Sequence, residues 1–164
     1  TGHCITAYLG NLRGIPTIDK AIADEEIFGI VSAAMKESGA GLIKKYGFDP
    51  EKHAAYIKKI IGRFKNPYLQ DDVTRVGREP LRKLSPTDRL IKPMVTAAGY
   101  GLPVDHLVIG AGAALHYDNP NDKQSVELQE KIGAQGVRAA AAEITGLTDE
   151  GLLDAIVAEY EKLN

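Results

Sequence analysis

The chain has a single cysteine, Cys4, among its 164 residues, so no disulfide within the chain can hold the fold together. It has no tryptophan, and aromatic residues make up only 6% of it, so the stacking surfaces that many nucleic-acid binders use are scarce. No apolar run approaches the roughly 20 residues that cross a bilayer, and no signal-peptide pattern is visible. These absences exclude a disulfide scaffold, predict no membrane partner and make the cytoplasm the default location.

What is present is an ordinary globular composition, with 44% hydrophobic residues, 26% charged residues and a formal net charge of −2. A chain of this length can bury one sizeable core, so we expect one domain. A general nucleic-acid binder would carry a basic overall balance, which this chain lacks. We therefore expect no nucleic-acid partner.

Apolar residues recur at helical spacing along nearly the whole chain, and turn-forming residues divide them into separate helices. Asp24 and Asp49 stand where helix N-caps are expected, and Gly47 stands where a helix should end. Ser85, followed by Pro86, predicts a further helix start. No hairpin signal or internal repeat accompanies them, so the sequence predicts an all-α, or nearly all-α, domain. The expected helices span residues 4–9, 25–46, 50–64, 86–95, 104–117, 123–135, 137–145 and 149–163.

Residues 107–115 imitate a buried strand that enters a glycine turn for a dinucleotide, because Gly110 and Gly112 have the G-x-G spacing. Leu115 stands where that motif needs a small residue, and the residues that follow offer no second parallel strand. The favoured interpretation is a helix whose two glycines permit close packing.

The four histidines are scattered without the spacing of a metal site, and Cys4 lies in an apolar stretch. We therefore expect no metal centre and no cysteine nucleophile. His3 differs from His53, His106 and His116, because it precedes the apolar run that begins at Cys4. An imidazole at the edge of such a helix is placed to face a cleft.

Positive charge is concentrated in one part of the chain. Residues 63–92 hold eight Lys and Arg against four Asp and Glu, whereas residues 118–164 hold four against ten. Guanidinium groups beside helix starts favour an anion such as a phosphate. A solvated basic surface is the alternative that the local sequence leaves open. The basic run consists of Arg75, Arg78, Arg82 and Lys83.

Four segments carry a resemblance to known enzymes: Thr1-Gly2-His3, Ala7-Tyr8-Leu9-Gly10, Arg63-Phe64-Lys65-Asn66-Pro67, and residues 75–90. The whole chain resembles the C-terminal domain of the mannitol-1-phosphate 5-dehydrogenases, which belong to the polyol-specific long-chain dehydrogenases. The resemblance implies that residues 1–164 form one helical substrate-binding and catalytic domain, similar to those of 6-phosphogluconate dehydrogenase-like enzymes. It also implies a partner, the family's N-terminal Rossmann domain, which binds NAD and is absent from this chain.

The resemblance assigns the catalytic role to His3. The family's signature is Lys, four residues, Asn, two residues and His, and His3 matches its last member. The Asn would then fall immediately before Thr1 and the Lys five residues further upstream.

The resemblance also assigns substrate-binding roles. Arg75 and Lys83 have the eight-residue spacing of the arginine and lysine that hold the polyol in related enzymes. Arg78 and Arg82 are additional cations, and we expect some of this set to hold a sugar phosphate. Asn66 is a candidate for a hydroxyl contact, or else a turn residue before Pro67.

The expected function is therefore the interconversion of D-mannitol 1-phosphate and D-fructose 6-phosphate with NAD, by metal-independent hydride transfer. The isolated chain is expected to be inactive. A mannitol 2-dehydrogenase or a hexuronate reductase is the alternative within this class. A stand-alone helical module that binds an anion or an acidic protein is the alternative from another class.

Overall fold

In the computed structural model, which describes residues 1–163, the regular structure consists of helices together with one isolated β-bridge between Thr17 and Asp72. The prediction of an all-α domain is confirmed. No helix in that range is long and apolar enough to cross a membrane. The helices are α1 (Gly2–Leu12), α2 (Ile18–Ala23), α3 (Glu25–Tyr46), α4 (Pro50–Phe64), the 3-10 helix η1 (Pro67–Leu69), α5 (Val73–Gly77), α6 (Pro80–Lys83), α7 (Ile91–Gly99), α8 (Asp105–Leu115), α9 (Lys123–Gln135), α10 (Val137–Thr145) and α11 (Glu150–Lys162).

The long helical hairpin formed by α3 and α4 begins and ends where the sequence predicts. The Asp24 carboxylate accepts hydrogen bonds from two backbone N–H groups in the first turn of α3, and Asp49 does the same for α4. Gly47 ends α3 in the left-handed conformation, with φ of 67°, which a glycine adopts without steric cost. Local signals therefore determine this hairpin.

The predicted helix start at Ser85 is wrong, because α7 begins six residues later at Ile91. Residues 85–90 form successive turns instead. The Asp88 carboxylate, which would have completed a capping box with Ser85, accepts hydrogen bonds from the backbone and side chain of Arg89. Leu84 and Leu90, one at each end of the segment, are both fully buried. Tertiary burial at both ends thus overrides the capping signal.

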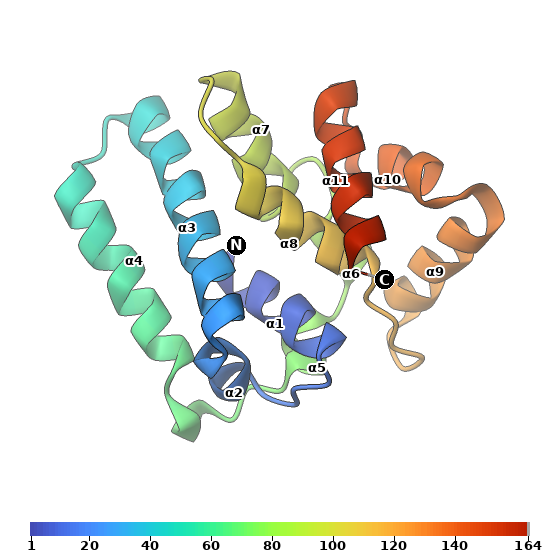
Figure 1. Cartoon of the computed structure of the whole chain (residues 1–164), viewed down its shortest axis with the longest axis horizontal. Coiled ribbons are helices and arrows are strands. Elements are labelled where there is room, and N and C mark those ends of the chain that lie inside the picture. The colour runs from blue at the N-terminus through green and yellow to red at the C-terminus, as the bar shows by residue number, and fades with distance from the viewer. Residues whose placement is uncertain (164) are drawn as a thin grey trace.

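Helix α1 is the centre of the fold and is enclosed by α2, α3, α5 and α8 (Figure 1). Every residue from Cys4 to Gly10 is buried, so this helix has no solvent-facing side over that stretch. The hydroxyl of Tyr8 reaches across to donate a hydrogen bond of 2.9 Å to the carbonyl oxygen of Gly77 at the end of α5. The first turn, which carries His3, emerges from the core at the surface.

Gly110 and Gly112 lie within α8, which confirms that they are packing residues rather than a dinucleotide-binding turn. A Cβ atom at Gly110 would lie 2.7 Å from the side chain of Ile5, and one at Gly112 would lie 3.0 Å from the backbone nitrogen of Tyr160. The two glycines therefore allow α8 to approach α1 on one side and α11 on the other.

The N-terminus of α8 is capped from another helix. Val104 occupies the N-cap position without a capping side chain. The carboxylate of Glu37, in the middle of α3, accepts hydrogen bonds from the backbone N–H groups of His106 and Leu107. Glu37 Oε1 also lies 2.7 Å from His106 Nδ1. Since the Glu37 side chain is only 10% exposed, this cap joins α3 to α8 inside the structure.

We expect Glu37→Ala to lower the free energy of unfolding by about 2 kcal/mol, because it leaves two N–H groups of α8 without their charged acceptor. Urea unfolding followed by circular dichroism measures this loss. The control is Glu127→Ala, which removes an exposed carboxylate 3.7 Å from Lys131 and should change stability by less than about 0.5 kcal/mol. Equal losses in the two variants would contradict the proposed role of the Glu37 cap.

Candidate active site

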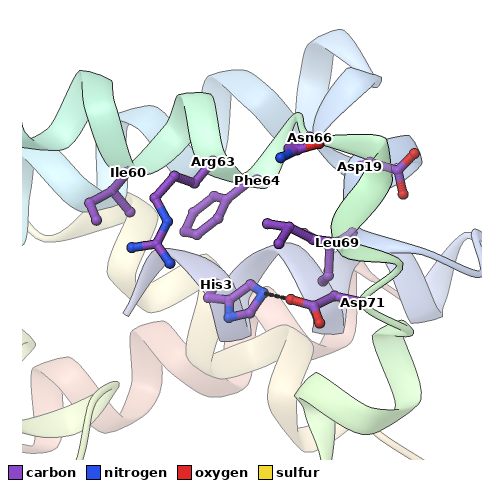
Figure 2. A pocket seen from close by; sticks show the side chains of 9 residues that line it. His3, Asp19, Ile60, Arg63, Phe64, Asn66, Leu69 and Asp71 are labelled. Atoms are coloured by element: carbon purple, nitrogen blue, oxygen red, sulfur yellow. Dashed lines mark ion pairs between the residues drawn. The ribbon is translucent and has the colours of Figure 1, made fainter.

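His3 lies in the first turn of α1 and faces a pocket of about 200 Å³ (Figure 2). Its imidazole stacks on the ring of Phe64 from α4, with centroids 5.0 Å apart and planes only 10° from parallel. The side chain is 40% exposed, so the ring is held on one face and accessible on another. This placement agrees with the expectation that His3 faces a cleft.

The pocket is lined by polar side chains from several elements. They are Asp19 from α2, Arg63 from α4, Asn66 before η1 and Asp71 before α5. The carboxylate of Asp71 points toward the imidazole, and its Oδ2 lies 3.2 Å from His3 Nε2 (Figure 2). Such a set of donors and acceptors suits a hydroxyl-rich ligand.

Asp71 also contacts the basic run. Its second carboxylate oxygen, Oδ1, pairs with the guanidinium of Arg75 one turn further along the chain. The backbone carbonyl of Asp71 accepts a hydrogen bond of 2.9 Å from Ile18 N, which fixes the segment against α2. One carboxylate thus brings together His3 and Arg75, two of the predicted site residues.

The surroundings of His3 favour its neutral form. Burial is the main cause of a lowered pKa, the Asp71 carboxylate opposes that effect, and Arg75 adds to it. Because the pKa falls below its ordinary value of 6.5, the imidazole is uncharged at pH 7. A neutral imidazole has one nitrogen that donates a hydrogen bond and one that accepts.

Arg75 and Arg78 line a second, more open groove of about 720 Å³ between α5 and the start of α9. Lys123 contributes a third cation to it. The two acids in the groove are already engaged, since Glu79 pairs with Arg82 at 2.8 Å and Asp122 accepts hydrogen bonds from two backbone N–H groups. Across residues 1–163, Arg78 and Lys123 form no ion pair. Their charges are available to an anion.

The residue that follows Arg78 has an unusual backbone conformation. Glu79 adopts the left-handed conformation with φ of 60°, which is uncommon for a side chain of its size. The carboxylate of Asp122 accepts a hydrogen bond of 2.7 Å from the Glu79 backbone N–H and so holds this turn in place.

Arg82 and Lys83 line neither the His3 pocket nor the groove beside Arg75 and Arg78. Arg82 pairs with Glu79. Lys83 is only 2% exposed, and its ammonium group donates hydrogen bonds to the backbone carbonyls of Val76 and Arg78. Burial lowers the pKa of Lys83 to about 8. In this conformation Lys83 braces the end of α5, and its predicted contact with a substrate stays a prediction.

Asn66 forms the turn expected before Pro67, and its contact with a substrate hydroxyl stays a prediction. Its side-chain oxygen accepts a hydrogen bond of 3.0 Å from Tyr68 N, as expected for a turn residue before Pro67. It also lines the His3 pocket. Its side-chain amide nitrogen has no hydrogen-bond partner in the described part of the chain, so Asn66 retains two donors for a ligand.

Two other kinds of site, a cysteine nucleophile and a metal centre, concern Cys4 and the histidine and acidic side chains. Cys4 is buried, its thiol contacts the carbonyl of Thr1, and burial raises its pKa, which disfavours the nucleophilic thiolate. Among residues 1–163 no group of three or more His, Cys, Asp or Glu side chains gathers at metal-binding distance. Arg89 forms an ion pair with Asp88, whereas Arg63 lines the His3 pocket.

Sequence reasoning missed Asp71, Asp19 and Lys123. Asp71 and Arg75 do have the i, i+4 spacing of an ion pair, which is a visible signal. No local pattern indicates the approach of Asp71 to His3, because the two residues belong to distant segments of the chain.

A comparison with protein families identifies the family of the chain. The family model described as the mannitol dehydrogenase C-terminal domain matches residues 1–164. The chain belongs to this family. The resemblance found from the sequence is confirmed at the level of the family, and the mannitol dehydrogenase C-terminal domain is part of oxidoreductases of the polyol dehydrogenase type.

The free energy of unfolding is expected to rise from about pH 8 toward pH 10.5 because of Lys83. The folded protein releases the Lys83 proton at about pH 8, whereas an unfolded lysine keeps it to its ordinary pKa of 10.5, so unfolding takes up a proton in this interval. Urea unfolding across this pH range should show that Lys83→Met removes part of the rise. The exposed Lys92 supplies the control, since Lys92→Met should retain the wild-type profile. A constant difference between wild type and Lys83→Met at every pH would contradict the expectation.

Proposed function

We propose that this chain is the substrate-holding domain of an NAD-dependent enzyme that interconverts D-mannitol 1-phosphate and D-fructose 6-phosphate. The main support for this proposal is the contact of Asp71 with both His3 and Arg75. This contact joins the histidine of the family signature to the cationic groove. A polyol in the His3 pocket would place its far end toward Arg75 and Arg78. A phosphate at that end would then meet cations.

The chain's own candidate for a dinucleotide site does not fit the cofactor. Gly110 and Gly112 lie inside α8, with Ile5 and Tyr160 packed against them, so no pyrophosphate can approach their backbone. The proposal therefore assigns NAD to an N-terminal Rossmann domain. When bound there, the nicotinamide supplies the hydride acceptor in polyol oxidation.

The residues of this chain bind and orient the substrate in that reaction. His3 forms a hydrogen bond with a hydroxyl beside the reacting carbon, and the stacked Phe64 ring fixes the plane in which it does so. Asp19 and Asn66 face the remaining hydroxyls from the pocket wall. The family resemblance assigns the base, which accepts the hydroxyl proton, to a lysine upstream of Thr1.

The groove beside Arg75 supplies charge for the phosphate. A guanidinium forms two parallel hydrogen bonds with phosphate oxygens, and each charge-assisted hydrogen bond is stronger than a neutral one. Arg78 and Lys123 enter this groove without a carboxylate partner within the described residues. Lys83 contributes indirectly, since it holds the backbone carbonyl of Arg78.

Replacing His3 tests the catalytic half of the proposal. In a protein extended to include the N-terminal domain, we expect His3→Ala to lower kcat/KM for mannitol 1-phosphate by about tenfold or more, because one hydrogen bond that orients the substrate is lost. NADH formation measures the rate. His116→Ala, at the C-terminal end of α8 and outside the hollows that His3 lines, is the matched control and should retain the wild-type rate. A near-normal rate for His3→Ala would remove His3 from the mechanism.

Replacing Arg78 tests the choice of substrate. Arg78→Ala should raise KM for fructose 6-phosphate by about tenfold to a hundredfold and leave KM for fructose nearly unchanged, because only the former carries a phosphate. Arg138→Ala, which removes an arginine paired with Glu150 and Asp154 in the C-terminal part of the chain, is the matched control. A hexuronate is included as a third substrate. Activity only with the hexuronate, or equal effects on both ketoses, would refute the sugar-phosphate assignment.

A further inference from the structure

The contact between Asp71 and His3 constrains which ring nitrogen carries the proton. Asp71 Oδ2 lies 3.2 Å from His3 Nε2. An anionic oxygen at that distance repels a lone pair and attracts an N–H group, so it favours the tautomer with the proton on Nε2. In the described part of the chain Nδ1 has no hydrogen-bond partner. Nδ1 is therefore left as a free acceptor.

Asp71 is itself held from several directions, so its carboxylate can impose this orientation. Its side chain is only 21% exposed, and its second oxygen pairs with Arg75 in the next turn. The backbone on either side is pinned, because Ile18 N donates to the Asp71 carbonyl and Asp72 forms a β-bridge with Thr17. The Phe64 ring stacked on the imidazole limits its rotation further.

We propose that Asp71 is a positioning residue that fixes His3 with Nε2 protonated, so that Nδ1 accepts a hydrogen bond from a substrate hydroxyl. The inference rests on the proposed function and sharpens it. In this tautomer Nδ1 accepts a hydrogen bond from a hydroxyl beside the reacting carbon, so the proton of the reacting hydroxyl stays available to the upstream base. The same carboxylate sets the position of Arg75, so the hydroxyl and phosphate ends of the site are built around one side chain.

The titration of His3 reflects more than Asp71, so its other charged neighbours have to be held constant in a test. Asp71 is the main group that raises the pKa of His3, whereas Arg75 and the amino terminus lower it, as burial does. The charged and titratable groups around the ring are Asp19 of α2, three side chains of α4 (His53, Tyr56 and Arg63), Asp71, Arg75 of α5 and, in the isolated chain, the amino group of Thr1.

NMR on the chain itself tests the positioning without any substrate. A long-range nitrogen–proton correlation spectrum of the wild-type protein should show His3 in the Nε2-protonated form, and finding the proton on Nδ1 would overturn the inference. Asp71→Asn should mix the two tautomers and shift the His3 titration to lower pH, because the negative charge is lost. Asp71→Glu should restore the Nε2-protonated tautomer and move the His3 titration back toward that of the wild type. Asp19→Asn, in the same pocket, is the control and should leave the tautomer unchanged.

Enzyme kinetics on the protein that includes the N-terminal domain test the same inference in a second way. They also distinguish a failure of this inference from a failure of the proposed function. In that protein Asp71→Asn should lower kcat for polyol oxidation on the order of a hundredfold and displace the pH profile, as expected when a histidine loses the group that orients it. Wild-type kinetics for Asp71→Asn in an active enzyme would overturn the positioning role and leave the proposed function intact. The expected NMR changes in a protein that oxidises no polyol would instead refute the proposed function.

Discussion

The complete burial of α1 is the constraint on which the rest of the structure depends. A helix with no solvent-facing side over Cys4 to Gly10 has to be surrounded, and α2, α3, α5 and α8 enclose it. Close approach is possible because α8 presents a glycine, Gly110, to Ile5. The enclosure leaves the two ends of α1 at the surface, so His3, in the first turn, acquires a fixed place beside segments that are distant in sequence. The position of the site is thus a consequence of core packing.

Much of the fold follows from local chemistry that is visible in the sequence. Asp24, Gly47 and Asp49 define the hairpin of α3 and α4 because each acts through its own backbone and a few neighbouring residues. Ser85 misleads because its effect depends on its surroundings. Burial of Leu84 and Leu90 requires a turn where the capping signal predicts a helix. The Glu37 cap of α8 has no local signal at all, since its donors and its acceptor come from different helices.

The candidate site also combines residues that the sequence indicates with residues that only the folded structure brings together. His3 and Arg75 were predictable from motif resemblance, and the structure joins them. Asp71, which joins them, was not predictable, because a carboxylate reveals no long-range partner in the sequence. Lys83 shows the converse limit. Its charge and spacing suggest an exposed ligand contact, yet its stem is buried and its ammonium group is bound to backbone carbonyls. Spacing along the chain shows which residues are neighbours but not which way they face.

Pairing with acids and carbonyl groups leaves few of the charges in the basic run uncompensated. Four cations in one stretch suggest a diffuse anion-attracting surface, but Arg75 is paired with Asp71, Arg82 with Glu79, and Lys83 is buried on carbonyl groups. Only Arg78 has neither an acidic partner within residues 1–163 nor a buried position. Because paired cations have already been compensated, they contribute little net attraction for an incoming dianion. In the proposed enzyme, discrimination between a phosphorylated and a neutral sugar would therefore depend chiefly on Arg78, together with Lys123 across the same groove, rather than on the charge of the run as a whole.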